Sequence, residues 1–251
     1  MSARICVLKL GGAKVEPSAD LSEIALHVQH LVRQGFLPVL VHGGGSEIAA
    51  LHDDLGMHRE KREGLRVTPD ASMDLVTMVL AGLVNKRLVA ALGAQGIRAI
   101  GLSGVDLGLI RAQWLDREAF GRVGAAPVVD DSVIRILLSQ GWVPVIAPVS
   151  IGPDGQPVNV NADTAAQAVA AALEAHTLDF VSDVDGVRTD EGIASRLTPD
   201  DVEALIASAV VRGGMTVKLR AATAALDAGV GRVRVGDLAT MRRETCTVVT
   251  A

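Results

Sequence analysis

Short apolar runs alternate along this chain with segments of helical periodicity, and several of the runs end in clustered glycines. Runs of β-branched and aliphatic residues predict buried strands at 4–10, 36–41, 97–102, 142–148, 178–182, 232–236 and 245–249. Amphipathic or capped segments predict helices at 21–34, 46–55, 68–92, 132–140, 163–174, from 198 onward and from 214 to 229. This alternation predicts an α/β fold, an αβα sandwich with a central, mostly parallel open sheet.

The chain has 251 residues, of which 49% are hydrophobic, and this length suits one open α/β domain spanning 1–251. A change of composition near residue 175 divides it into lobes 1–175 and 176–251. The net charge of −5 and 2% aromatic content argue against a nucleic-acid partner. No window approaches the roughly 20 apolar residues of a membrane span, so we expect no membrane association and a cytoplasmic protein. Cys6 and Cys246 lack metal-ligand spacing, and we expect two reduced thiols.

Ligands in open parallel sheets bind beyond the carboxyl ends of the strands, where we expect the glycine clusters 11–12, 43–45 and 101–104. Three glycines between a strand and a helix can turn backbone N–H groups toward one anion, although a plain tight turn remains an alternative. His-Gly-Gly-Gly at 42–45 also occurs in the oxyanion loops of some esterases, but 101–105 lacks the last glycine of the nucleophile motif. Walker and dinucleotide-binding patterns are absent.

Lys9 ends an apolar strand immediately before two glycines, where a charge is costly unless it faces an anion. Lys218 follows Gly214 in the first turn of a predicted helix. Either lysine could instead be an ordinary surface residue. Phosphoryl transfer needs positive charge on the migrating group and on the leaving group, which two lysines held by Asp163 could supply. We interpret His42 as a structural hydrogen-bonding residue of the loop.

Six motifs occur in the order found in acetylglutamate kinases, and the chain resembles that branch of the amino acid kinase family along nearly its whole length. The motifs are Val-Leu-Lys-Leu-Gly-Gly (7–12), Val-His-Gly-Gly-Gly (41–45), Gly-Leu-Arg-Val-Thr (64–68), Asn-Val-Asn-Ala-Asp (159–163), Ser-Asp-Val-Asp-Gly (182–186) and Gly-Met-Thr-Val-Lys (214–218). The first lysine, the triple glycine and the late lysine are shared by the wider family. The motifs at 64–68 and 159–163 are narrower and resemble acetylglutamate kinases in particular.

The resemblance implies ATP-dependent phosphorylation of the γ-carboxylate of N-acetyl-L-glutamate in arginine biosynthesis. It implies catalytic roles for Lys9, Lys218 and Asp163, the last orienting both lysines. Substrate and phosphoryl contacts would come from Gly11, Gly12, Gly44, Gly45, Arg66 and Asn159. The nucleotide would be lined by Asp183, Val184, Asp185, Gly186, Val187, Arg188, Val210, Val211 and Arg212. The N-terminal lobe would hold the amino acid and the C-terminal lobe the ATP, with Mg²⁺ carried by ATP rather than by a protein metal site.

Two departures from the family pattern qualify these expectations. The loop 104–108 lacks the Lys-Asp-Gly often present in relatives, and the chain starts almost directly at its first strand. The second feature suggests a homodimer that is insensitive to arginine, formed through the long helix after Thr68. A carrier-protein-linked aminoadipate or glutamate kinase of lysine biosynthesis, and a non-catalytic nucleotide or amino acid sensor, remain alternatives.

Overall fold

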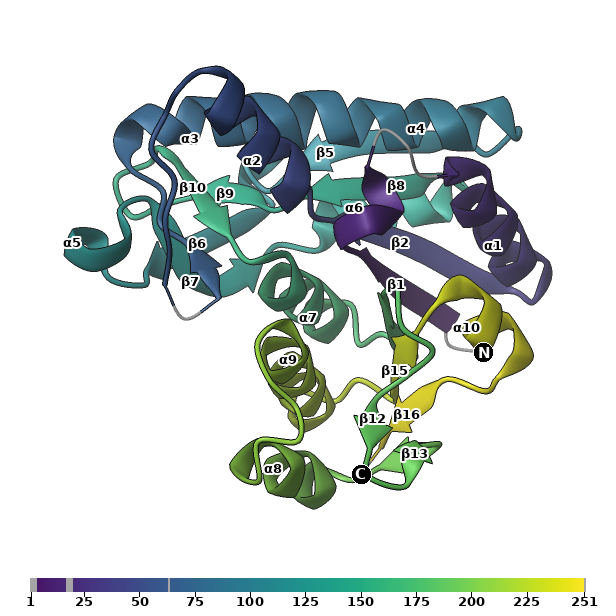
Figure 1. The fold of residues 1–251 in the computed structure, drawn as a ribbon. Helices are drawn as coiled ribbons and strands as arrows, with labels where there is room; N and C mark the ends of the chain where they lie inside the picture. Colours follow the sequence, from purple (N-terminus) through teal and green to yellow (C-terminus); the bar gives the residue numbers. More distant parts are fainter. Residues whose placement is uncertain (1–3, 17–19, 63, 251) are drawn as a thin grey trace.

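The computed structural model describes residues 4–16, 20–62 and 64–250, and a central eight-stranded sheet organises them (Figure 1). Every pair of neighbouring strands is parallel except β15 and β16. In spatial order the strands are β14 (Arg196–Leu197), β16 (Thr247–Val249), β15 (Val233–Gly236), β11 (Thr177–Val181), β1 (Arg4–Leu10), β2 (Phe36–His42), β8 (Val143–Ala147) and β5 (Ala99–Ser103). The predicted mostly parallel α/β sheet is confirmed.

Helices cover both faces of this sheet (Figure 1). The α-helices are α1 (Leu21–Arg33), α2 (Gly45–Asp54), α3 (Asp70–Thr77), α4 (Asn85–Ala94), α5 (Arg117–Phe120), α6 (Ser132–Ser139), α7 (Ala162–Ala172), α8 (Pro199–Ala207), α9 (Gly214–Asp227) and α10 (Leu238–Arg243). The shorter or distorted helices are η1 (Gly12–Val15), the π-helical η2 (Met78–Val84) and η3 (Asp106–Gly108). The helix expected over 68–92 is therefore continuous, with a π-helical middle.

Strand β1 shows how the sequence divides the core into two layers. Side chains alternate between the two faces of a strand, so Cys6, Leu8 and Leu10 join the cluster that α1, α3, α4 and α10 cover. Val7 joins the opposite cluster, which α7 and α9 cover. Lys9 has the same parity as Val7, so this alternation directs its side chain toward α7 and α9.

A small closed barrel forms from four strands that the sequence analysis did not predict. It consists of β6 (Ile110–Trp114), β7 (Val123–Val129), β9 (Val149–Ile151) and β10 (Pro157–Val160). Arg122 joins the barrel to the start of α3, because its guanidinium contacts Asp70 at 3.1 Å and Asp154 at 2.8 Å. Two further hairpins are β3 (Lys61–Arg62) with β4 (Leu65–Arg66), and β12 (Arg188–Thr189) with β13 (Gly192–Ile193).

Two sequence-based expectations need correction. Gly101 lies inside β5 rather than beyond its end, and a Cβ there would stand 1.9 Å from Oδ1 of Asn85, so this glycine serves helix–strand packing. The continuous helix Asp70–Ala94 does reach the length and apolarity of a membrane span, with mean hydropathy 1.7 in its best window. Of that window 44% is buried inside the protein, and the core helix of a soluble protein meets the same criterion. The division into lobes 1–175 and 176–251 stays a prediction.

Candidate active site

Two lysines from distant parts of the chain meet on one carboxylate oxygen. The Nζ atom of Lys9 lies 2.8 Å from Oδ1 of Asp163, and the Nζ atom of Lys218 lies 3.3 Å from the same oxygen. The two ammonium groups therefore cannot be farther apart than the sum of these distances. All three side chains are about nine-tenths buried. This arrangement concentrates two positive charges around one negative charge at the carboxyl end of β1.

Each member of this cluster is positioned by the start or end of an element. Lys9 is the second-last residue of β1, and Asp163 lies in the first turn of α7. Asn161 caps α7, because its Oδ1 accepts the backbone N–H groups of Asp163 at 2.8 Å and Thr164 at 3.3 Å. Lys218 lies one turn into α9, and its ammonium group stands 5.0 Å from the ring centroid of Phe180.

The charges of the cluster depend on one another. Burial raises the pKa of Asp163, but Lys9 and Lys218 lower it by more, so that the pKa lies below its ordinary value. Burial lowers the pKa of Lys218 below its ordinary value; Asp163 opposes this shift, and Lys9 adds to it. Asp163 is therefore ionised at neutral pH, and the cluster carries an excess of positive charge that suits an anionic ligand.

A cavity of about 460 Å³ opens beside Lys9 and collects most of the residues predicted for the substrate. Gly11, Gly44, Gly45, Arg66 and Asn159 line it, whereas the part predicted for Gly12 lies outside what the structure describes. The sequence analysis missed further lining residues of this cavity, which include Glu16, Ser46, Lys61 and Asn161. Lys61 could have been found from its spacing. It lies five residues before Arg66, the predicted carboxylate-binding arginine, and the two residues pair across the β3–β4 hairpin.

Two polar side chains on the wall of this cavity, those of Arg66 and Asn159, are candidates for contacts with a ligand. The Nη2 atom of Arg66 donates to the carbonyl oxygen of Gly45 at 2.7 Å, and among the described residues Arg66 makes no ion pair. Burial and the nearby Arg59 lower the pKa of Arg66. The amide of Asn159 donates to Oγ1 of Thr68 at 3.1 Å. A guanidinium that has no carboxylate partner among the described residues, in the same cavity as an amide, can bind the carboxylate end of a small acid.

The glycine loops allow the backbone to approach the cluster closely. A Cβ at Gly11 would stand 2.5 Å from Nζ of Lys9, and a Cβ at Gly44 would stand 2.9 Å from Cδ2 of Leu80. Gly44 precedes the first turn of α2, whose backbone N–H groups receive no side-chain cap from the part of the chain that the structure describes. A helix start with free N–H groups attracts negative charge.

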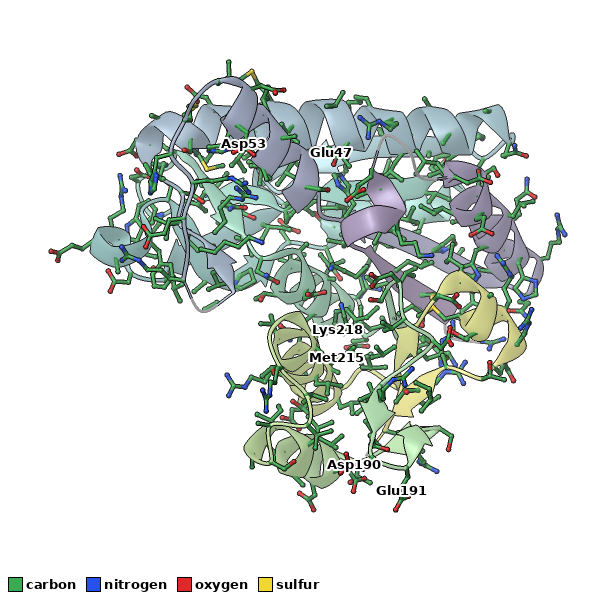
Figure 2. The ribbon with its side chains drawn as sticks, viewed as in Figure 1. Glu47, Asp53, Asp190, Glu191, Met215 and Lys218 are labelled. Carbon is green, nitrogen blue, oxygen red and sulfur yellow. The ribbon has the colours of Figure 1, made fainter. Side chains whose placement is uncertain are left out.

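A second cavity of about 380 Å³ lies between the loop after β11 and the segment before α9. It is lined by most of the residues predicted for the nucleotide, namely Asp183, Val184, Asp185, Gly186, Arg188, Val210, Val211 and Arg212. Ile193 and Met215, which the sequence analysis missed, also line it. Figure 2 shows Met215 beside Lys218 on α9, so the helix that borders this cavity also carries the second lysine.

Val187 is the one predicted nucleotide-site residue that the structure places elsewhere. Its side chain is fully buried in the core, and its backbone N–H donates to Oγ1 of Thr247 at 2.7 Å. Val187 immediately precedes β12, whose first residue, Arg188, lines the cavity.

His42 faces away from the lysines. It follows Val41 in β2, and neighbouring residues of a strand point to opposite faces of the sheet. Its Nδ1 donates to the carbonyl oxygen of Gly43 at 2.9 Å, and its Nε2 accepts from the amide of Asn85 at 3.1 Å. Burial lowers the pKa of His42 to about 4, so the ring is neutral at pH 7. The esterase interpretation finds no support here, because the hydroxyl of Ser103 donates to Asp106 at 2.9 Å and makes no hydrogen bond to a histidine of the described segments.

No group of three or more His, Cys, Asp or Glu side chains could hold a metal ion within residues 4–16, 20–62 and 64–250. The one carboxylate at the centre of the cluster, Asp163, is already engaged by two lysines.

Comparison with known proteins assigns the chain to a family. The profile described as "Amino acid kinase family" matches residues 4–237, and the chain belongs to this family. It is 46% identical to the acetylglutamate kinase of Chloroflexus aurantiacus over 240 residues, covering 94% of this chain and 92% of that protein. It is 42% identical to the acetylglutamate kinase of Symbiobacterium thermophilum, covering 94% and 85%. The crystal structure of smu.665 from Streptococcus mutans superposes with a TM-score of 0.87 at 34% identity, covering 98% of both chains.

Proposed function

We propose that this protein is an acetylglutamate kinase, which transfers the γ-phosphoryl group of ATP to the side-chain carboxylate of N-acetyl-L-glutamate in arginine biosynthesis. One observation supports this most directly: Lys9 and Lys218 share Asp163, and Lys9 also lines the cavity that contains Arg66 and Asn159. The relatives named acetylglutamate kinase, at 42% and 46% identity over nearly the full chain, support the same substrate.

In this proposal the two lysines stabilise the charge that moves during transfer. A carboxylate nucleophile is already ionised at neutral pH, so attack on the γ-phosphorus needs no general base. The ammonium of Lys9 neutralises the equatorial oxygens of the migrating group, and that of Lys218 neutralises the charge that develops on ADP. Asp163 contacts the two ammonium groups at 2.8 and 3.3 Å and holds them in place.

The cavity beside Lys9 binds the amino acid in this proposal. Arg66 grips the α-carboxylate through two parallel hydrogen bonds, and Asn159 contacts the same end of the substrate. The backbone N–H groups of Gly11, Gly44 and Gly45 donate to the migrating phosphoryl group. Lys61, across the β3–β4 hairpin from Arg66, adds positive charge to the rim.

The second cavity binds ATP in this proposal, and Mg²⁺ enters as part of the nucleotide complex with the phosphates as its ligands. The protein acts as a homodimer in the cytoplasm. The continuous helix Asp70–Ala94 supports the choice of interface, because it exposes Met78 and Leu83 to 60% and 54% while its other side is buried. Large exposed apolar side chains on one helix commonly mark a contact between subunits.

Measuring ADP release from MgATP tests the proposal. N-acetylglutamate, glutamate and aminoadipate are supplied side by side at equal concentrations. We expect turnover with N-acetylglutamate to exceed that with the other two by roughly 10²-fold or more, because both of these lack the acetyl group and carry a free ammonium group, which the guanidinium of Arg66 in the same cavity would repel.

Two other outcomes would overturn the proposal. Turnover only with a carrier-linked aminoadipate or glutamate would assign the enzyme to lysine biosynthesis. Tight ATP binding without turnover of any acceptor would identify a sensor. As a matched control, Arg66→Ala should mainly raise KM for N-acetylglutamate, whereas Arg59→Ala, which changes an arginine outside the cavity lining, should change KM little.

A further inference from the structure

A third cavity, of about 300 Å³, lies at the opposite end of the strands from the lysine cluster. Arg4 at the start of β1, Phe36 at the start of β2 and Arg232 just before β15 contribute to it, together with the ends of α1 and α10. Lys9 lies at the other end of β1, so this cavity is separate from the proposed kinase site.

The charge in this cavity is strongly unbalanced. Arg4, Arg232 and Arg242 line it, and none of them makes an ion pair with another residue of the described part of the chain. Arg234 also lines it, but that guanidinium is matched by the buried Asp179, which it contacts at 2.7 Å. Three unmatched guanidinium groups therefore face a single lining carboxylate, that of Glu244, because Asp179 belongs to its own pair.

Two of the arginines are already held near the cavity. The guanidinium of Arg4 stacks 4.0 Å from the ring centroid of Phe36, and Nε of Arg232 donates to Oγ1 of Thr177 at 3.4 Å. Guanidinium groups held in this way lose less conformational freedom when they bind an anion.

His27 provides an independent indication of a missing ligand. Its side chain lies on α1, is 1% exposed and lines the cavity, yet neither ring nitrogen has a hydrogen-bond partner among residues 4–16, 20–62 and 64–250. A buried ring without a partner is unfavourable and calls for an explanation. Burial lowers the pKa of His27 to about 4, so the ring is neutral at pH 7 and offers one N–H donor.

We propose that this cavity is a binding site for a phosphate group, either inorganic phosphate or the phosphate of a small metabolite. A tetrahedral dianion offers acceptors to the N–H of His27 and to guanidinium groups converging from β1, β15 and α10, and it offsets their charge. Phosphate is preferred over a monocarboxylate because three guanidinium groups exceed what one negative charge can balance. The proposal does not depend on the proposed kinase activity.

Nuclear magnetic resonance of the histidine rings tests this proposal on the whole protein. The chain has six histidines, and the signal of His27 is assigned by its loss in His27→Gln. Inorganic phosphate and glycerol 3-phosphate are titrated separately at constant ionic strength maintained with potassium chloride. We expect a saturable shift of the His27 signal, and the tighter of the two ligands identifies the source of the phosphate. Phosphate bound only near Lys9 would leave this signal unmoved.

Two neighbouring arginines on α10 provide a matched pair of variants. Arg242 lines the cavity and Arg243 does not, although both are exposed. Arg242→Ala should weaken the phosphate-dependent shift of His27 roughly tenfold, as expected for one lost charge-assisted contact, whereas Arg243→Ala should change it less than about twofold. Equal weakening in both variants, or no saturable shift up to high phosphate, would overturn the proposal. Because both positions face solvent, neither substitution should prevent folding.

Discussion

Replacing Asp163 by asparagine tests the electrostatic argument most directly, because it removes the one negative charge between two buried cations. At an effective dielectric of about 20, each contact near 3 Å is worth about 5 kcal/mol of Coulomb energy before desolvation is counted. Removing one partner of a buried pair typically costs about 3–5 kcal/mol. Lys9 borders a cavity that admits water, so we expect Asp163→Asn to lower the free energy of unfolding by about 3 kcal/mol, at the lower end of this range.

The same substitution should also lower turnover. Without Asp163 the two ammonium groups repel each other and leave the positions where the phosphoryl oxygens need them, so we expect kcat to fall at least ~10²-fold. ATP supplies negative charge of its own, so a saturating ATP analogue should recover part of the lost stability.

Urea unfolding with and without the analogue, together with the rate of ADP release, measures these effects. Asp190→Asn is the control, because Asp190 is exposed on the β12–β13 hairpin, well away from Lys218 in Figure 2. A stability loss below about 1 kcal/mol combined with unchanged kcat would refute the reasoning, since a buried charge of this kind cannot be removed without consequence.

Three further predictions follow from the same site. Gly11→Ala should lower kcat roughly tenfold or more in steady-state assays, because its methyl group would stand 2.5 Å from Nζ of Lys9 and displace that ammonium. Gly44→Ala should cost about 1–3 kcal/mol in urea unfolding, because its Cβ would stand 2.9 Å from Cδ2 of Leu80; Leu80→Ala should recover part of this loss in a double-mutant cycle. The unfolded chain protonates His42 below a pKa of about 6.5, but burial lowers the folded-state pKa to about 4. Stability should therefore fall as pH drops from 6.5 to 4, by up to about 1.4 kcal/mol per pH unit for this ring, and His42→Gln should show a shallower slope.

Much of the fold could be predicted because its signals are local. Helix caps such as Thr198 before α8, and apolar runs such as residues 4–10, which form β1, act over a few residues and are visible in the sequence. The barrel after residue 104 could not be predicted, because β10 pairs with β7 and β9, and no local pattern specifies such partners. The same limit explains Gly101. A side chain cannot fit at this position because Asn85, on another element, occupies the space.

The residues of the candidate site could also be predicted from the sequence only in part. The resemblance named Lys9, Asp163, Lys218, Arg66 and Asn159, and the structure brings all five to one region. Their catalytic and binding roles stay predictions that the kinetic experiments address.

The amino-acid sequence alone determined which residues carry charge at the ends of strands, and the parity of β1 determined that Lys9 faces the same layer as Val7. Only the tertiary structure decided that Lys218 reaches Asp163 across 55 positions of the chain, that Val187 turns inward, and that arginines from separate elements converge beside His27. The physical reason is the distance along the chain over which each effect acts. Periodicity and capping operate within one element, whereas the balance of charge and the filling of space in a cavity depend on side chains that meet only after the sheet has assembled.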